Sequence, residues 1–521
     1  MSVPSRTLDA VRTVLVSDSD GATLVRTDES GTPVEAPRRT ADVAATVREI
    51  EAAEHPRWVF EDSARACPPL LAEGVRVQRS HDLRLTGALL DMRAGRLAPA
   101  PEMPVDDRPG LFDAVASTAP DVVIERHRRQ LAAIADDPRL RLLVAAESAG
   151  GLAAAEMSHD GLPFSTDAHL ALLADALGPR TRDDMLPVRL HQVADEVSAA
   201  FGRQVNPASQ PEVVAAFARE GIELASTRKY LLREIDHPAV EPLLRYRDLA
   251  KLHAANGWTW LDAWVRGNRF RPVYVPGGVV SGRWASRGGG ALQIPKALRT
   301  SVIADPGHTF VIADAGQLEP RILAAMSGDP RMTAAAGTDD LYALVAAEVF
   351  GGDRAKAKIA ILGVLYGATA GEARALLTLL RKRFPVAVQL VEDAARAGER
   401  GEVVHSWLGR ACPPPSDSWW SNGDTHARGR FTRNFVVQAT AAEWALCLLA
   451  DLRRRLSAAP GDGELVFFQH DEVMVHTRRP DAAAAHVLAS AASATRLLFG
   501  DTAVRFPMEV EVRECYAEPE D

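Results

Sequence analysis

A chain of 521 residues is too long for one hydrophobic core, and a prior of roughly 100–200 residues per domain predicts three to five lobes. Its 47% hydrophobic and 25% charged residues are ordinary for a globular protein. The net charge of -9 excludes a globally basic, histone-like DNA binder, but it leaves room for a local basic surface.

The absence of targeting signals and the spacing of the cysteines further restrict the class of protein. There is no run of about 18 uncharged apolar residues and no apolar stretch behind a basic start, so we expect neither a membrane span nor a secretory signal. The four cysteines (Cys67, Cys412, Cys447, Cys515) form no CxxC pair, which argues against a zinc ribbon or a disulfide framework. A cytoplasmic protein with reduced thiols is predicted.

The first 125 residues mix short β-like runs with breaks. RTVLVSD (12–18) and RWVFED (57–62) read as strands, and the Pro- and Asp-rich stretch at 98–110 reads as a linker or an edge loop. From about residue 126 to about 260 the pattern is helical and rich in Ala, Leu and Arg.

Within this helical arm, basic residues gather over about two predicted helices. They are Arg228, Lys229, Arg233, Arg245, Arg247 and Lys251. Such a group is either a solvated helix face or a surface for nucleic-acid phosphates, and the segment alone fits both.

Strand signals then flank a helical insertion. VYVPGGVVSGRWAS (273–286) and HTFVIADAGQ (308–317) read as strands, 340–400 as helices, and ELVFFQHDEVMVHT (464–477) as a hairpin. This order predicts a sheet from which a helical subdomain emerges.

Two carboxylates stand where this sheet would end. Asp314 closes a β-like run and precedes a helix that starts near Gln317, a position that also suits a helix N-cap. Asp471 lies with His470 and Glu472 at the turn of the apolar hairpin, where turn chemistry is the simpler explanation. If both strands share one sheet, Asp314 and Asp471 lie close together and require cations between them, of which two hard divalent ions are the obvious choice.

A third pattern is the segment 354–367. Four side chains recur at every fourth residue and would form one stripe on a helix: Arg354, Lys358, Leu362 and Tyr366. Two cations followed by an apolar and an aromatic residue suit, in order, the phosphates and then the base and sugar of a nucleotide, although an amphipathic helix with its cations on the solvent-exposed face fits as well. Gly363 and Gly367 weaken a helix and permit a close approach to its backbone.

Together these segments resemble the family A DNA polymerases, the DNA polymerase I type, in order and spacing. DAGQLEPR (314–321) resembles the first palm motif, RAKAKIAILGVLYG (354–367) the fingers helix, and QHDEV (469–473) the second palm motif. Weaker matches fall in the same order: SGRWAS (281–286), ALQIP (291–295), GEVVHSWLGR (401–410) and RFTRNFVVQATAAE (430–443). The resemblance covers about residues 130–521 and extends to the actinobacterial chains described as bifunctional 3′–5′ exonuclease/DNA polymerases.

The resemblance implies an α+β right-hand fold with palm, fingers and thumb, preceded by a small degenerate exonuclease-like α/β domain of the RNase H type. Its implied domains are 1–125 (exonuclease-like), 126–280 (helical connection and thumb), 281–350 (first part of the palm), 351–429 (fingers) and 430–521 (second part of the palm). It implies a monomer that binds primer–template DNA and dNTPs away from membranes.

The resemblance also implies roles for single residues. Asp314 and Asp471 would ligate two Mg²⁺ ions, with Mn²⁺ as a substitute, and Glu472 would support them. The nucleotide would contact Gln317, Glu319, Arg354, Lys358, Leu362 and Tyr366, with Glu319 under the sugar so that it excludes a 2′-hydroxyl. The DNA would contact Arg283, Gln293, Arg430, Asn434, Gln438, His470, Lys229 and Lys251.

The chain departs from the family pattern at several of these positions. Ala315 and Gly316 replace Tyr-Ser, and Pro320 replaces Leu directly after Glu319. Leu362 replaces the usual Phe or Tyr that lies against the sugar of the incoming nucleotide. We therefore expect weaker dNTP binding than in relatives with an aromatic ring there.

In the N-terminal region the exonuclease pattern is incomplete. The family's Asp-x-Glu is not found, Asp62 could match the second motif but Trp58 stands in place of Asn, and Asp121 could match the third but Ser117 stands in place of Tyr. This predicts a scaffold without nuclease activity. Two other functions remain open, a non-catalytic DNA-binding accessory protein and a single-subunit RNA polymerase, and Glu319 argues against the latter.

Overall fold

The computed structural model describes residues 11–96, 118–182, 185–287, 290, 294–367, 372–422 and 425–518. The chain divides into two compact units. Unit 1 comprises 1–160, 274–285 and 307–513, and unit 2 comprises 161–273, 286–306 and 514–521. The predicted linker at 98–110 and the predicted DNA contact Gln293 lie outside the described residues.

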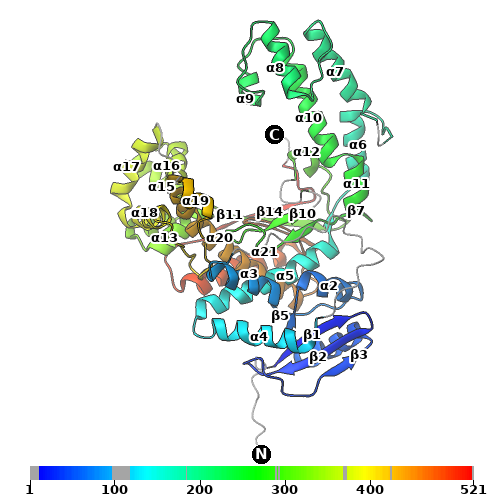
Figure 1. Ribbon diagram of the computed structural model, residues 1–521, viewed down its shortest axis with the longest axis vertical. Helices are drawn as coiled ribbons and strands as arrows, with labels where there is room; N and C mark the ends of the chain where they lie inside the picture. The colour runs from blue at the N-terminus through cyan, green and yellow to red at the C-terminus, as the bar shows by residue number, and fades with distance from the viewer. Residues whose placement is uncertain are drawn as a thin grey trace, which may run out of the picture. The chain divides into compact units, whose positions relative to one another are not determined.

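Unit 1 begins with a five-stranded sheet in the order β3-β2-β1-β4-β5 (Figure 1, blue). Its strands are β1 (Arg12–Asp18), β2 (Gly21–Thr27), β3 (Arg38–Thr40), β4 (Arg57–Phe60) and β5 (Arg79–Asp82). β1 pairs antiparallel with β2 and parallel with β4, and β4 pairs parallel with β5. The strands predicted at 12–18 and 57–62 are confirmed as β1 and β4.

Helices cover both faces of this first sheet. They are α1 (Val43–Glu54), α2 (Ser63–Ala72), α3 (Leu83–Arg93), α4 (Pro120–Ile134) and α5 (Pro138–Asp160). Because side chains alternate along a strand, Leu15 of β1 packs towards α1, α2 and α5, whereas Val14 and Val16 pack against Val123 and Ile124 of α4.

The second sheet of unit 1 has the order β12-β13-β11-β14, and its pairs are antiparallel. The strands are β11 (Thr309–Ala315), β12 (Glu464–Gln469), β13 (Glu472–Thr477) and β14 (Met508–Arg513). β12 and β13 are the predicted hairpin, with a bulge between Leu465 and Phe467. The prediction that the hairpin and the strand ending at Asp314 share one sheet is therefore confirmed.

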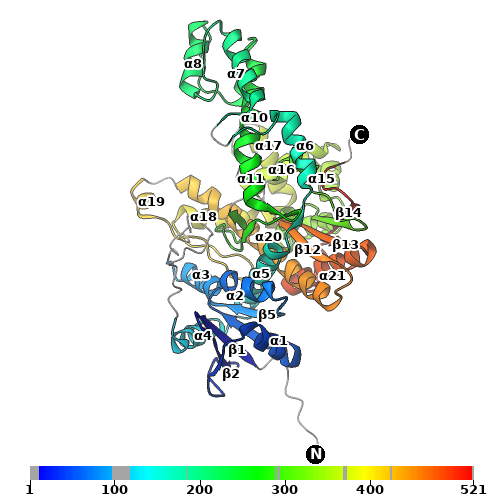
Figure 2. The ribbon, with the colours of Figure 1, turned by 90° about the vertical axis from the view of Figure 1, so that its right-hand side faces the viewer.

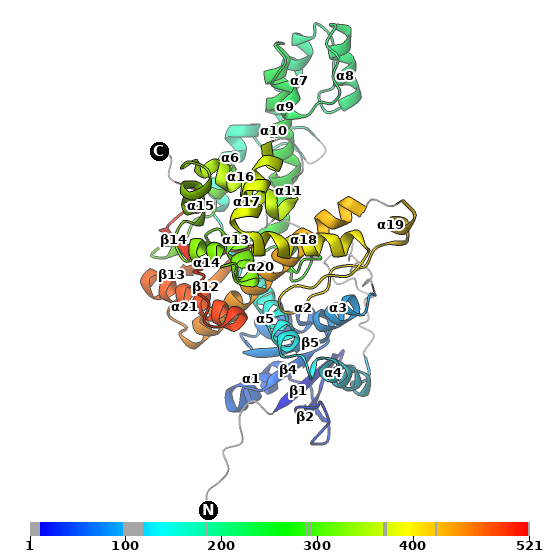
Figure 3. The ribbon, with the colours of Figure 1, turned by 90° about the vertical axis from the view of Figure 1, so that its left-hand side faces the viewer.

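The helical insertion between β11 and β12 is also as predicted. The helices are α13 (Leu318–Ser327), α14 (Pro330–Ala336), α15 (Leu341–Val349), α16 (Arg354–Tyr366), α17 (Glu372–Arg383), α18 (Pro385–Glu399), α19 (Asp417–Asn422) and α20 (Thr425–Ala458). Figure 3 shows α15 to α18 side by side, and α18 packs along α20. α21 (Pro480–Phe499) packs on α20 and on the second sheet.

Two of these helices, α20 and α21, are long and apolar enough to cross a membrane by length and composition. The window of α20 that meets this criterion is 83% buried inside unit 1, against 33% for α21. Helix α20 is thus the central core helix of the unit.

Unit 2 is mainly helical (Figure 2). Its helices are α6 (Thr166–Leu177), α7 (Val188–Ala200), α8 (Gln210–Arg219), α9 (Lys229–Leu232), α10 (Val240–Asn256), α11 (Trp258–Trp264) and α12 (Lys296–Arg299). A core around Phe201 and Phe217 joins α7, α8, α9 and α10. A small sheet has the order β6-β8-β7, from β6 (Leu162–Pro163), β7 (Val265–Arg266) and β8 (Arg269–Phe270).

The prediction of strands throughout 273–286 is wrong for most of that segment. Only β9 (Val273–Val275) and β10 (Ala285–Arg287) are extended, and they pair with each other. Between them the chain turns at Gly277 (φ 62°) and Gly282 (φ 84°), left-handed conformations that glycine adopts without strain. These turns are incompatible with a continuous strand through 273–286.

Candidate active site

The first candidate ligand, Asp314, is the last residue but one of β11. The chain then turns through Gln317, which has a left-handed backbone (φ 58°), before α13 begins at Leu318. The alternative that Asp314 caps this helix is excluded, because the N-cap residue is Gln317 and it makes no side-chain cap bond. Asp314 is therefore available for another role.

The second candidate, Asp471, lies in the two-residue turn between β12 and β13. His470 adopts φ 58°, which closes the turn, and Gln469 pairs with Glu472 across it. Since Glu472 also pairs with Asp314 on β11, the turn lies beside the end of that strand. The Ala315 amide donates to the Asp471 carbonyl at 3.2 Å, so the two aspartates lie at the same end of the sheet.

The electrostatics of the pair favour cation binding. Burial first, then the charges of Asp471 and Glu509, raises the pKa of Asp314 to about 6. Burial also raises the pKa of Asp471 to about 6, against the opposing effect of Arg283. Hard carboxylate oxygens that repel each other in a partly buried site suit divalent cations such as Mg²⁺, so the residues present fit the predicted metal pair.

Both aspartates line a cavity of about 270 Å³ in unit 1. Its lining also includes Arg283, Ala315, Gln317, Leu318, Glu319, Pro320, Tyr342, Leu362, Tyr366, Ala441, Ala442 and His470. The structure thus gathers residues from β11, α13, α15, α16, α20 and the hairpin turn around one space.

Glu319, in the first turn of α13, is held from two sides. Its Oε1 accepts a hydrogen bond from Arg283 at 2.5 Å, and its Oε2 accepts one from the Tyr366 hydroxyl at 2.7 Å. Burial and the bond to this carboxylate raise the pKa of Tyr366 to about 12. Three residues that the sequence assigned separately to sugar, base and DNA are thus one hydrogen-bonded group.

The predicted stripe lies on α16. Asp353 caps the start of this helix, and Gly367 (φ 67°) ends it. Arg354 and Lys358 are exposed, whereas Leu362 is half-buried and faces the cavity. Arg354 donates to Asp340 at 2.8 Å, which holds its guanidinium at the start of α15.

Helix α20 carries three of the predicted DNA contacts at a spacing of four: Arg430, Asn434 and Gln438. Arg430 is exposed and packs beside Gly367, and Asn434 is half-buried. Gln438 hydrogen-bonds with Tyr366. The same helix face therefore leads from the end of α16 towards the cavity.

Gln317 makes two hydrogen bonds that the sequence did not indicate. Its amide donates to Asp340 at 2.8 Å and accepts from the backbone of Leu341 at 2.9 Å, which ties the start of α13 to the start of α15. Its predicted contact with a nucleotide remains a prediction. The predicted DNA contacts Lys229, which pairs with Asp248, and the exposed Lys251 lie in unit 2.

Sequence reasoning missed two further residues at this site. Arg321 is fully buried and donates to the carbonyls of Gly316, Ala336, Thr338, Asp339 and Arg505, so it fixes the chain that follows Asp314. Tyr342 lines the cavity from α15. An aspartate at position 340 is a suitable start for a helix. No pattern in the sequence, however, indicated that the first turn of this helix, with Tyr342, lines the same cavity as Asp314.

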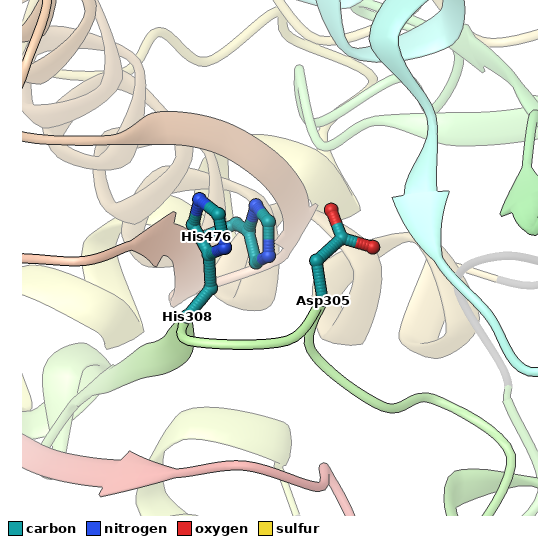
Figure 4. A group of neighbouring side chains, drawn as sticks. All are labelled: Asp305, His308 and His476. Carbon is teal, nitrogen blue, oxygen red and sulfur yellow. The ribbon is translucent and has the colours of Figure 1, made fainter.

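Another polar group lies at the opposite end of the same strands. The rings of His308 and His476 stack with centroids 4.4 Å apart (Figure 4), and His476 pairs with Phe310 rather than with Asp314. Figure 4 also draws Asp305, which belongs to unit 2 and there pairs with Arg269. The histidine pair is therefore distinct from the aspartate pair.

The two aspartates that could match exonuclease motifs, Asp62 and Asp121, both lie at helix starts in the N-terminal part of unit 1. Asp62 caps α2 and pairs with Arg84 at 2.9 Å, and Asp121 is exposed in the first turn of α4. Val14 and Val16 of β1 face α4 as part of an apolar cluster. Within the described parts of residues 11–134, no three His, Cys, Asp or Glu side chains bring their ligand atoms within 4.8 Å of one another.

The raised pKa of Asp314 predicts that Asp314→Asn stabilises the metal-free protein at neutral pH. The folded-state pKa is about 6 and the unfolded value is 3.8, so the ionised carboxylate opposes folding above pH 6. Between about pH 6 and pH 4 the Asp314 carboxyl of the wild type takes up a proton on folding. The stability advantage of Asp314→Asn should therefore disappear as the pH falls through this range.

Thermal unfolding in EDTA at pH 7.5 and at pH 4.5 measures this difference. The exposed Asp236→Asn serves as the control and should melt like the wild type at both pH values. A lower melting temperature for Asp314→Asn at pH 7.5 would contradict the electrostatic account.

Comparisons with known proteins agree on one family. The family model for DNA polymerase family A matches residues 181–516. DNA polymerase I of Chloroflexus aurantiacus is 28% identical over 46% of this chain, and the thermostable DNA polymerase I of Thermus aquaticus is 27% identical over 54% of it. These matches cover 28% and 36% of the two relatives, so the chain spans about a third of their length.

A solved structure shares the fold. The POL domain of Pol1 from M. smegmatis, in complex with DNA primer-template and dNTP, superposes with a TM-score of 0.72 at 19% identity. The superposition covers 98% of this chain and 95% of that one. The predicted right-hand fold is thereby confirmed, and because the family model matches well over half of the residues, this chain belongs to DNA polymerase family A.

Proposed function

We propose that this protein is a template-directed DNA polymerase that adds dNTPs to the 3′ end of a primer. The observation that carries the proposal is the pair Asp314 and Asp471, which the antiparallel strands β11 and β13 bring to one end of the sheet and into one cavity. Family membership supports it, as does the ligand set of the structural neighbour, which is primer-template and dNTP.

Asp314 and Asp471 would hold the two divalent ions, Mg²⁺ or Mn²⁺, with Glu472 as their neighbour in register. In this site, bound ions would supply activation of the primer 3′-hydroxyl and neutralisation of the charge on the leaving pyrophosphate. The protein's part is to fix the two carboxylates, which the sheet register and the buried Arg321 do.

The incoming nucleotide would lie along α16. Arg354 and Lys358 would bind its phosphates, Tyr366 would stack near the templating base, and Glu319 would crowd a ribose 2′-hydroxyl. DNA would contact Arg283, His470, Arg430, Asn434 and Gln438, and beyond these Gln293, Lys229 and Lys251. We place the protein as a monomer in the cytoplasm, at the nucleoid and away from membranes, in DNA repair or gap filling.

Primer extension tests this function. The protein is incubated with Mg²⁺ and a primer–template in three reactions, containing dNTPs, rNTPs or no nucleotide. We expect extension with dNTPs and much less with rNTPs. Duplex binding without extension would favour the accessory-protein alternative, and efficient rNTP use would favour a single-subunit RNA polymerase.

The third reaction carries a separate prediction for the N-terminal domain. We propose that this domain is an inactive exonuclease scaffold, because Asp62 is committed to a helix cap and an ion pair, and valines fill the neighbouring strand face. No metal-dependent shortening of the primer is expected without nucleotides. Shortening that Asp62→Ala or Asp121→Ala removes would contradict this.

A further inference from the structure

The turn at 277–284 determines the position of Arg283 at the cavity. Two backbone hydrogen bonds close this turn, from the Val279 amide to the Arg283 carbonyl at 3.0 Å and from the Gly282 amide to the Val279 carbonyl at 2.8 Å. Arg283 lines the cavity and donates to Glu319. Whatever holds the turn therefore also places one of the hydrogen-bond donors to that carboxylate.

The turn packs on a buried ion pair. Arg410 donates to Glu147 of α5, and the two side chains are 8% and 2% exposed. A Cβ atom added to Gly282 would lie 2.5 Å from the Nε atom of Arg410. One added to Gly277 would lie 3.6 Å from the Glu147 carboxylate. The guanidinium of Arg410 thus lies directly against the residue that precedes Arg283.

Arg410 is itself fixed, because the loop at 401–410 is tied to α20. The fully buried Glu443 of α20 accepts hydrogen bonds from the Ser406 hydroxyl and, at 3.0 Å, from the Leu408 amide. The Ser406 hydroxyl accepts from the Arg410 amide at 2.8 Å. Replacing a buried ion pair with apolar side chains is often neutral for stability, so burial alone does not explain this pair. Its fixed place between two helices suits it to positioning the turn.

The residue that follows Arg283 is held by the same helix. Trp284 is 2% exposed, and its ring packs edge-on against Phe468 of β12 with centroids 4.8 Å apart. A Cβ atom added to Gly150 of α5 would lie 3.4 Å from the Trp284 ring. Because Gly150 lies three residues after Glu147, both are on one face of α5. That face therefore holds the chain on both sides of Arg283.

We propose that Glu147 is a positioning residue for Arg283 and, through it, for the Glu319 carboxylate that selects the sugar. This inference rests on the proposed polymerase function. Other residues of α5, Leu152 and Ala155, belong to the apolar cluster that joins α5 to the first sheet. The N-terminal domain would thus contribute to sugar selection as a support for α5, without any nuclease activity of its own.

The test measures the ratio of kcat/KM for dCTP to that for CTP in single-nucleotide primer extension. This ratio does not depend on the fraction of folded enzyme, so a loss of stability alone leaves it unchanged. Glu147→Gln keeps the size of the side chain and removes its charge. It should lower the ratio by about three- to tenfold, the range for weakening one hydrogen bond.

Glu156→Gln is the matched control. Glu156 also lies on α5 and forms an ion pair at 2.6 Å with the buried Arg453 of α20, but it does not line the cavity and lies nine residues from Glu147. This variant should lower the melting temperature and leave the ratio unchanged. An equal fall of the ratio in Glu156→Gln would assign the effect to general loosening of α5 and overturn the inference.

A double-variant cycle tests whether the effect passes through Arg283. Arg283→Ala alone should lower the ratio. In that background Glu147→Gln should change it by less than about twofold, because the group that it positions is already absent. If Glu147→Gln does not fold, Gly282→Ala takes its place, since its Cβ atom would displace either the turn or the Arg410 guanidinium.

The remaining outcomes separate this inference from the function on which it rests. If the wild type extends primers but folded Glu147→Gln keeps the wild-type ratio, the inference is wrong and the polymerase assignment stands. Fully additive effects of Glu147→Gln and Arg283→Ala, or an unchanged ratio in Arg283→Ala, would overturn the inference as well. Failure of the wild type to extend any primer would overturn both.

Discussion

Replacing Asp314 or Asp471 with alanine is expected to reduce metal-dependent primer extension by at least about a thousandfold. That factor corresponds to about 4 kcal/mol of lost transition-state stabilisation, which is reasonable for removing one ligand from a two-ion site. β13 and β14 fix the register on both sides of Asp314, so β11 cannot slide to bring another of its side chains into this position.

The experiment measures single-turnover extension and, separately, binding to the primer–template. Binding should change little in both variants, since each removes a metal ligand and leaves the phosphate contacts in place. Glu511→Ala, an exposed carboxylate on β14, serves as the control and should extend like the wild type. Extension within tenfold of the wild type in Asp314→Ala or Asp471→Ala would contradict the two-ion assignment.

Replacing Glu319 with alanine is expected to lower the preference for dNTPs over rNTPs by about ten- to a hundredfold. Forcing an extra group into a filled site costs about 1–3 kcal/mol, and the Glu319 carboxylate is fixed in place by Arg283 and Tyr366. A carboxylate held on both sides cannot easily move aside for a 2′-hydroxyl. The alanine variant removes the obstacle.

The measurement is the ratio of kcat/KM for dCTP to that for CTP opposite one template base. Glu319→Gln is the matched control, because it keeps the size of the side chain and should retain most of the discrimination. A ratio unchanged in Glu319→Ala would mean that Glu319 does not lie beneath the sugar. A ratio lost equally in both variants would point to charge rather than crowding.

The features that the sequence predicted correctly are those encoded locally. The hairpin around Asp471 follows from two apolar runs and a polar turn, and the helix at 354–366 follows from its periodicity and its terminal Gly367. Asp314 and Asp471 could be expected in one sheet because each lies next to a strand-like run of apolar residues. Local pattern and overall fold agree in these segments.

The features that were missed depend on tertiary contacts. Arg321 could be read as an ordinary helix arginine, but it is fully buried because five backbone carbonyls surround it. Tyr342 had no periodic or motif signal, and its position at the cavity arises from the packing of α15 beside α16. The partner of Gln317, Asp340, is 23 residues away along the chain, beyond the reach of local patterns.

The most direct test of the central claim is single-nucleotide insertion with four primer–templates that differ only in the templating base. Each is incubated with the wild-type protein, Mg²⁺ and one dNTP at a time, with EDTA and Asp471→Ala reactions alongside. We predict that only the complementary dNTP is added efficiently on each template, and that both EDTA and Asp471→Ala abolish the addition. Addition of the same nucleotide whatever the template, or no addition with Mg²⁺ or Mn²⁺ despite duplex binding, would contradict the claim that this protein is a template-directed DNA polymerase.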